Sequence, residues 1–226
     1  MNGFLDTIFN SFQKNLLDGD AYLVVLNGLW VTIQLSAFGL FFGTIWGALL
    51  CSLRMSKIKI FARTAQLIIA VLRGSPVLLL LMILYYVVFA DIRINPVFVA
   101  VIGFVLNSGA HFAEVMRSCI TAVDEKQLEA ARMLGFSKAK AFFLITLPQA
   151  WKIANPVYQN SVVNMIQWTS VVGYITIADI TRVMNNIGLR TGDPFFSLFF
   201  GVLVYLGLSY LVYAFFSIGR KRGKSL

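Results

Sequence analysis

Charged residues are scarce in this sequence. They make up 13% of the 226 positions, whereas hydrophobic residues make up 58%. A soluble domain averages about 25% charged residues, roughly twice the share found here. The charges also gather in a few stretches and leave long apolar runs between them. This pattern predicts an all-α integral membrane protein with one multi-pass domain, and it argues against a soluble nucleic-acid-binding fold.

The residue types that build metal centres and active sites are scarce as well. The chain has one histidine, His111, and two cysteines, Cys51 and Cys119, which are far apart in the sequence. We expect the cysteines to be free thiols packed as small apolar groups. Among the acids, only Glu114 falls inside an apolar run. We therefore expect no metal site, no cofactor and no catalytic residue in this chain.

A phosphate-binding loop is also missing. No segment matches Gly-x-x-x-x-Gly-Lys-Ser/Thr, the motif that wraps nucleotide phosphates in many ATPases. The chain therefore does not bind ATP in that manner, and any ATP-driven work must depend on another polypeptide.

Five apolar runs predict five transmembrane helices. They cover about 22–53, 60–90, 97–120, 153–177 and 195–218. The second run is broken at Arg73-Gly74-Ser75-Pro76, because proline lacks a backbone donor and glycine loosens a helix. In the first run, Gly39, Gly43 and Gly47 recur every four residues, a spacing that lets another helix approach closely. Residues 1–20 predict an external amphipathic helix in the membrane interface.

Basic residues predict the orientation. Most of the 19 Lys and Arg residues fall at one set of span ends: after the first run, between the third and fourth, and after the fifth. The positive-inside rule then places the N-terminus outside and the C-terminus, with a basic tail at 221–226, in the cytosol. The membrane domain is expected to span 21–220, and residues 179–193 are expected to form an external polar loop.

The polar stretch at about 121–149, called the elbow below, lies between the third and fourth runs. Residues 125–134 predict a short helix, Gly135 a left-handed end, and Ser137 the cap of a second helix. Two interpretations are open from the residues alone. The elbow either rests on the membrane surface or docks a soluble partner in the cytosol.

Within the elbow, Glu129-Ala130-Ala131, Gly135 and Ile145-Thr146-Leu147-Pro148 resemble the EAA signature of binding-protein-dependent ABC importer permeases. The resemblance runs from about 22 to 218. Further local matches resemble the polar amino-acid subfamily, the histidine/glutamine/arginine/opine type. They are Asn27-Gly28-Leu29-Trp30, Arg73-Gly74-Ser75-Pro76, Asn107-Ser108-Gly109-Ala110 and Leu147-Pro148-Gln149-Ala150.

The resemblance implies a type I ABC importer fold in a prokaryotic cytoplasmic membrane. It implies a second permease subunit, identical or homologous, and an extracytoplasmic solute-binding protein. It also implies a dimer of cytosolic ATPases that holds ATP and Mg²⁺. The elbow would then be the coupling helix, with these residues meeting the ATPase: Glu129, Ala130, Ala131, Gly135, Phe136, Leu147 and Pro148. An ion-gradient-driven secondary transporter is the alternative, but that class favours repeated halves and several intramembrane acids.

Polar residues inside the spans are candidates for the substrate path. They are Arg73, Ser75, Asn107, Ser108, Asn164, Gln167, Trp168, Thr169 and Ser170. Arg73 either contacts a substrate carboxylate or satisfies carbonyls freed by the break beside it. Glu114 and Arg117 are spaced to form an ion pair along one helix face. Members of the subfamily usually carry a Lys-Asp type pair where this chain has Gln167-Trp168. That departure favours a neutral or acidic substrate, or a partner permease that holds the substrate.

Overall fold

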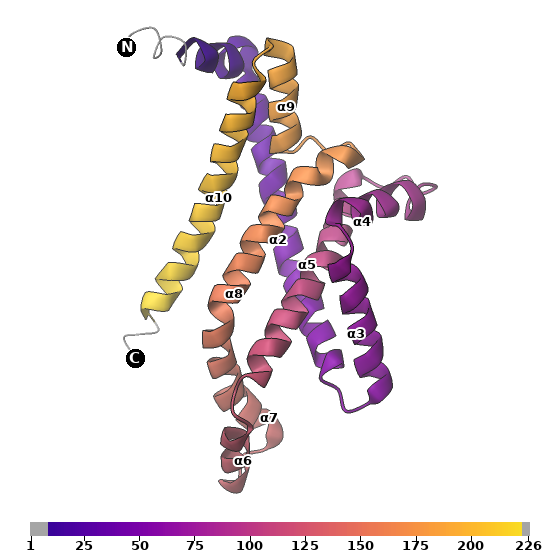
Figure 1. Cartoon of the computed structure of the whole chain (residues 1–226), viewed down its shortest axis with the longest axis vertical. Helices are drawn as coiled ribbons and strands as arrows, with labels where there is room; N and C mark the ends of the chain where they lie inside the picture. The colour runs from indigo at the N-terminus through magenta and orange to yellow at the C-terminus, as the bar shows by residue number, and fades with distance from the viewer. Residues whose placement is uncertain (1–8, 223–226) are drawn as a thin grey trace. The chain divides into compact units, whose positions relative to one another are not determined.

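The structure is a computed structural model that describes residues 9–222, with side chains described to residue 217 (Figure 1). Every regular element in this part of the chain is a helix, which confirms the predicted all-α class. The elements are η1 (Gln13–Leu17), η2 (Asp18–Asp20), α2 (Ala21–Arg54), α3 (Lys59–Gly74), α4 (Val77–Ile83), η3 (Leu84–Val88), α5 (Pro96–Thr121), α6 (Glu125–Met133), α7 (Lys138–Ala141), η4 (Phe142–Thr146), α8 (Leu147–Trp168), η5 (Thr169–Ile175), α9 (Ile180–Thr191) and α10 (Pro194–Arg222).

The chain divides into two compact units. Within the described residues, unit 1 comprises 9–38, 77–103 and 163–222, and unit 2 comprises 39–76 and 104–162. The helices α2, α5 and α8 each contribute residues to both units.

Several helices are long and apolar enough to cross a membrane. Among the described residues they lie in Phe9–Arg54, Pro96–Thr121 and Pro194–Ser217, and the broken pair Lys59–Gly74 with Val77–Val88 adds a fourth if it counts as one span. α8, which carries the predicted fourth span, is not among them. The count of five spans therefore stays a prediction.

Unit 2 is built on a close crossing of α2 and α5. A Cβ added at Gly47 would lie 2.8 Å from the Gly109 carbonyl oxygen, and one at Gly109 would lie 2.9 Å from the Gly43 carbonyl oxygen. Ser108 Oγ donates to the Gly39 carbonyl across the same crossing at 3.3 Å. The predicted glycine stripe thus brings two backbones together, as small residues do between membrane helices.

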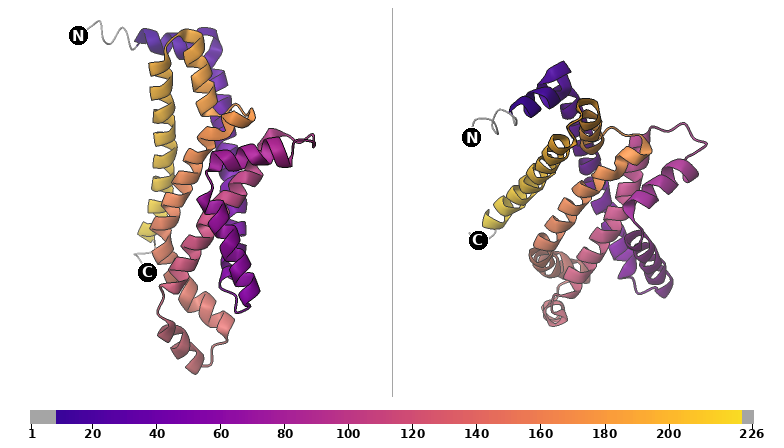
Figure 2. Two further views of the ribbon diagram at one scale, coloured as in Figure 1. Left: turned by 45° about the vertical axis from the view of Figure 1, so that its right-hand side comes forward. Right: turned by 45° about the horizontal axis from the view of Figure 1, so that its top comes forward.

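Unit 1 contains a helix where the sequence analysis expected a polar loop. That prediction for 179–193 was wrong, because α9 occupies Ile180–Thr191. Asp179 caps its first turn by accepting from the amides of Thr181 and Arg182, and Gly192 ends it with φ +69°. The apolar face of α9 is buried in a cluster that includes Val25 and Leu16, and Figure 2 shows α9 and α10 running alongside each other.

The N-terminal segment is held against α9 and the start of α10. Asn15 is fully buried; its side-chain amide donates to Asp193 at 3.2 Å, and its carbonyl oxygen accepts from Thr191 at 2.7 Å. Phe12 meets Phe196 edge to face with 6.2 Å between ring centroids. Of the amphipathic helix predicted for 1–20, residues 1–8 lie outside the described part, and residues 9–20 are helical with a turn at Gly19 (φ +67°).

Candidate functional site

The elbow consists of two short, separately capped helices. Asp124 caps α6 by accepting from the Lys126 amide at 3.0 Å, and Ser137 caps α7 by accepting from the Lys140 amide at 3.3 Å. Side-chain caps satisfy amides that the first turn of a helix leaves unpaired. Each helix therefore begins at a position fixed by its own sequence, as predicted. α6 ends at Met133, one residue before the predicted boundary.

Gly135 makes the turn between these helices. Its φ is +87°, and a Cβ added there would meet no atom within 4 Å. The need for glycine is therefore conformational and has no contribution from packing. Pro148 is the second residue of α8, so it lies in the first turn of the next helix.

The tip of the elbow exposes large apolar side chains. Met133 is 88% exposed and Leu134 is 79% exposed, whereas Ala131 is buried at 3%. Leu134 is the C-cap of α6, beyond its last helical residue. A shallow hollow of about 590 Å³ lies beside the tip, lined by Glu129, Arg132, Met133, Gly135, Phe136 and Ser137.

The break after α3 leaves the Leu72 carbonyl without a helical donor, because Pro76 has no backbone N–H. The Asn107 side-chain amide donates to this carbonyl at 2.9 Å. The Val71 carbonyl keeps the Ser75 amide as its helical donor at 3.1 Å and accepts from the Ser75 hydroxyl as well, at 2.8 Å. Asn107 is 2% exposed and Ser108 is fully buried. Asn107 thus fills the structural role considered for Arg73, whose side chain is exposed.

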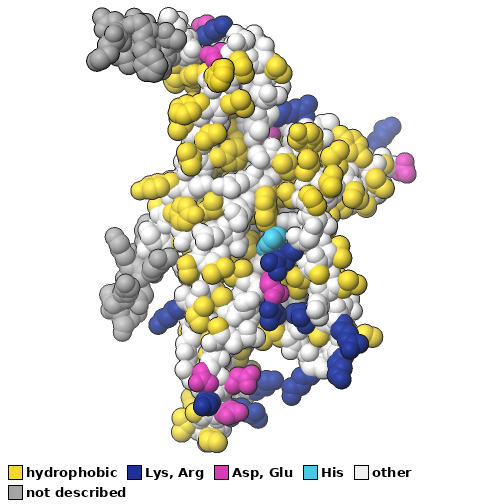
Figure 3. Space-filling view, viewed as in Figure 1, with side chains coloured by type: hydrophobic (Ala, Val, Ile, Leu, Met, Phe, Trp, Pro, Cys, Tyr) yellow, Lys and Arg dark blue, Asp and Glu magenta, His cyan; other side chains and the backbone are white. Residues whose placement is uncertain are grey.

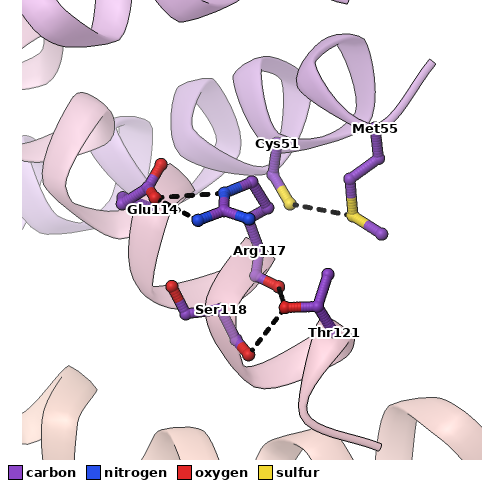
Figure 4. Close-up of polar contacts among 6 residues, drawn as sticks. All are labelled: Cys51, Met55, Glu114, Arg117, Ser118 and Thr121. Carbon is purple, nitrogen blue, oxygen red and sulfur yellow. Dashed lines mark hydrogen bonds and ion pairs between the residues drawn. The ribbon is translucent and has the colours of Figure 1, made fainter.

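Charged side chains gather on α5 of unit 2. Glu114 accepts from Arg117 Nε at 3.0 Å and from its Nη2, which confirms the predicted ion pair (Figure 4). Arg73 interacts electrostatically with both Glu114 and His111. Figure 3 shows the histidine among basic and acidic side chains on one face. Charges within an apolar span are unfavourable in lipid, so this cluster needs water or protein beside it.

The remaining path candidates lie in unit 1, on α8 and η5. Asn164 and Gln167 are exposed, Trp168 is partly buried, and Thr169 is fully buried with its hydroxyl donating to the Ile166 carbonyl at 2.6 Å. Gln167 and Ser170 line one cavity of about 370 Å³ together with residues of α9 and α10. The predicted path residues thus form one group around the α3–α5 contact and another on α8.

Residues 39–222 match the family described as the binding-protein-dependent transport system inner membrane component. The chain belongs to this family. It is a multi-pass inner-membrane permease, and membership decides against the alternative of a secondary transporter.

Relatives of the permease align with most of its length. The probable amino-acid ABC transporter permease protein YckA of Bacillus subtilis (strain 168) is 33% identical over 204 residues, covering 90% of each chain. The L-cystine transport system permease protein TcyB of the same organism is 30% identical over 188 residues, covering 83% of this chain and 80% of that protein.

A solved structure described as an amino acid ABC transporter with histidines also resembles the permease. It superposes with a TM-score of 0.81 at 29% identity and covers 89% of this chain and 94% of that one. This likeness supports the type I ABC importer permease fold that the EAA resemblance implied.

Some features of the permease went unrecognised in the sequence. Met133 and Leu134 were not singled out as contact residues, although two large apolar side chains just before a glycine turn were a usable signal. The capping signal Asp179 and the apolar spacing Ile180, Val183, Met184 and Ile187 were present as well. They were missed because the charged and amide residues between them suggested a loop.

Proposed function

We propose that this permease moves a polar amino acid into the cell as part of an ATP-driven importer. The names of its relatives YckA and TcyB support an amino-acid substrate. The buried and partly buried polar side chains in its spans support a polar solute over a lipid-like one.

The elbow is the proposed coupling element. The observation that carries this assignment is the exposure of Met133 and Leu134 at the tip of two capped helices joined by Gly135. Exposed apolar side chains on a well-ordered turn are suited to burial in a partner's groove. The partner is a cytosolic ATPase dimer that holds ATP and Mg²⁺, with Glu129, Ala130, Ala131, Phe136, Leu147 and Pro148 completing the contact.

The proposed topology has five spans, with the N-terminus outside and the C-terminus in the cytosol. The segregation of basic residues supports this orientation. A second permease, identical or homologous, completes the membrane part, and a solute-binding protein delivers the substrate to the side that carries α9.

Two groups of polar side chains, one within each unit, are proposed to contribute to the substrate path. Arg73 of unit 2 supplies a cation for a substrate carboxylate, because Asn107 already satisfies the Leu72 carbonyl freed by the break beside it. Ser108 lies next to Asn107, and the unit 1 group is Asn164, Gln167, Trp168, Thr169 and Ser170. With no carboxylate at Gln167-Trp168, the substrate side chain is neutral or acidic, or the second permease holds a cationic one.

Reconstitution with the ATPase and the binding protein tests this function. We expect ATP hydrolysis by the complex to rise when the loaded binding protein is added, together with uptake of the amino acid. The double variant M133Q/L134Q should bind the ATPase about tenfold or more weakly, as expected for loss of central interface residues. Leu189→Gln is the matched control, since Leu189 is an equally large apolar residue, 75% exposed, on α9.

Two results would contradict the proposal. If M133Q/L134Q bound the ATPase as tightly as the wild type, the elbow would not be the coupling element. If the wild-type complex hydrolysed ATP but took up none of the twenty amino acids, the substrate class would be wrong.

A further inference from the structure

Unit 2 contains an apolar cavity of about 550 Å³ whose lining includes Leu147, one of the proposed ATPase contact residues, and none of the substrate-path candidates. It is lined by faces of three helices and by η4. The lining residues are Ala48, Cys51, Ser52 and Met55 of α2; Val115, Met116, Cys119 and Ile120 of α5; Phe142 and Phe143 of η4; and Leu147, Ala150, Trp151, Ala154 and Tyr158 of α8. Its volume falls within the range of about 300–1,000 Å³ typical of small-ligand pockets.

Small residues form the floor of this cavity and large residues form its rim. Cys119, Ala150 and Ala154 pack into one buried cluster, and none is more than 7% exposed. At the rim, Phe143 is 62% exposed and Trp151 is 51% exposed. The cavity is therefore a cleft lined by short side chains, with two largely exposed aromatic rings at its edge that contact Phe142 and Tyr158.

Both hydroxyls and one of the two thiols in the cavity wall interact with other groups of the chain. The Tyr158 and Thr44 hydroxyls lie 2.5 Å apart, and the Ser52 hydroxyl donates to the Leu49 carbonyl at 2.7 Å. The Cys51 thiol faces Met55 Sδ at 3.8 Å (Figure 4). A polar solute such as the transported amino acid would lose hydrogen bonds to water here and gain few in return, so the cavity suits a hydrocarbon chain.

Basic residues border the cavity lining in the sequence. Arg54, Lys57, Arg117, Lys140 and Lys152 each lie within two positions of a lining residue. The one acid equally close, Glu114, is paired with Arg117. Lys57 and Lys152 are exposed and flank Met55 and Trp151 of the rim. An apolar cleft between membrane helices with cationic residues at one end matches an acyl chain that carries an anionic head group.

We propose that this cavity binds one acyl chain of an anionic phospholipid, whose head group interacts with Lys57 and Lys152. The assignment depends on the membrane location of the family and not on the transported substrate or on coupling to the ATPase. The lipid belongs to the leaflet at the elbow end of α2 and α5, since both basic residues lie at that end.

Photocrosslinking in the assembled importer tests the proposal. The permease complex is reconstituted into nanodiscs that contain phosphatidylglycerol or phosphatidylcholine with a diazirine at the middle of one acyl chain. We expect phosphatidylglycerol to label peptides that contain residues 115–120 and 142–158, with phosphatidylcholine labelling them weakly.

Two variants separate the head-group contact from the cavity. K57Q/K152Q should reduce labelling at a given phosphatidylglycerol fraction by about tenfold or more, because each basic residue near the surface contributes to anionic lipid binding. R132Q/K138Q, which removes two basic elbow residues away from the lining, should leave labelling unchanged. Ala154→Phe fills the cleft and should abolish labelling there by both lipids, with correct folding checked by ATPase co-purification.

Three results would overturn the proposal. Equal cavity labelling by the two lipids, or full labelling of K57Q/K152Q, would show that binding does not require an anionic head group. Undiminished labelling of a folded Ala154→Phe variant would place the lipid elsewhere. Protection of the cavity from both lipids in the complex, with crosslinks from a partner subunit in their place, would assign the cleft to a protein contact.

Discussion

The side-chain amide of Asn107 donates a hydrogen bond of 2.9 Å to the Leu72 carbonyl, which has lost its helical partner at the break before Pro76. This contact ties α5 to the end of α3 within unit 2. Asn107, a candidate for the substrate path, therefore also stabilises the break between α3 and α4.

Asn107→Ala should destabilise the permease by about 1–3 kcal/mol, because it leaves the partly buried Leu72 carbonyl without a donor. The measurement is the thermal unfolding of the purified protein in detergent. Ser75→Ala is the control, since the Ser75 backbone amide also donates to the Val71 carbonyl at 3.1 Å, and a small change is expected. Equal losses in the two variants would contradict the assignment.

Gly135→Val should impair coupling without preventing membrane insertion. A β-branched residue in a left-handed conformation is disfavoured by roughly 1–2 kcal/mol, and no neighbouring atom adds a clash. ATP hydrolysis stimulated by the loaded binding protein is the measurement. The control is Gly74→Val, a glycine whose added Cβ also meets nothing within 4 Å but whose φ is not positive. Normal stimulation in Gly135→Val would count against the coupling role.

Gly47→Ala should lower stability by about 1–3 kcal/mol, the range for overpacking a close contact. The new methyl group would lie 2.8 Å from the Gly109 carbonyl oxygen and 2.9 Å from Phe112 Cβ, so a helix backbone has to shift. Gly207→Ala on α10 meets no atom within 4 Å and should be neutral or slightly stabilising. Comparing the thermal unfolding midpoints of Gly47→Ala and Gly207→Ala with that of the wild type tests the prediction.

Asp193 should make the contact between Asn15 and α10 sensitive to acid. The Phe196 amide donates to this carboxylate at 3.2 Å and lowers its pKa, so the folded state favours the charged form. Its contribution to stability is complete above the ordinary aspartate pKa of about 3.9 and is lost as the pH falls through the lowered value.

Asp193→Asn should therefore reduce the loss of stability on acidification from about pH 6 to about pH 3, a window that brackets the ordinary aspartate pKa. Asp91→Asn, at an exposed loop carboxylate, is the control and should leave the acid dependence unchanged. An identical pH profile for Asp193→Asn and the wild type would show that this carboxylate does not contribute.

The sequence predicted those structural features that depend only on residues close together in the chain. Ser137 caps its helix and Gly135 turns the elbow because a few neighbouring residues decide both. A close helix contact along the glycine repeat of α2 was also predicted, but its partner α5 was not. The donor to the Leu72 carbonyl could not be predicted, because Asn107 lies 35 positions from Leu72 and only the fold brings them together. α9 was missed because its short apolar face is interleaved with polar residues.

The crossing of α2 and α5 brings glycine backbone atoms together, with the side chains of Trp46, Ser108 and Phe112 packed beside them. Long side chains at an interface can re-pack and absorb a small displacement, but a carbonyl oxygen facing a glycine has no such freedom. Within unit 2, a displacement of α5 at this crossing is therefore expected to move α2 with it.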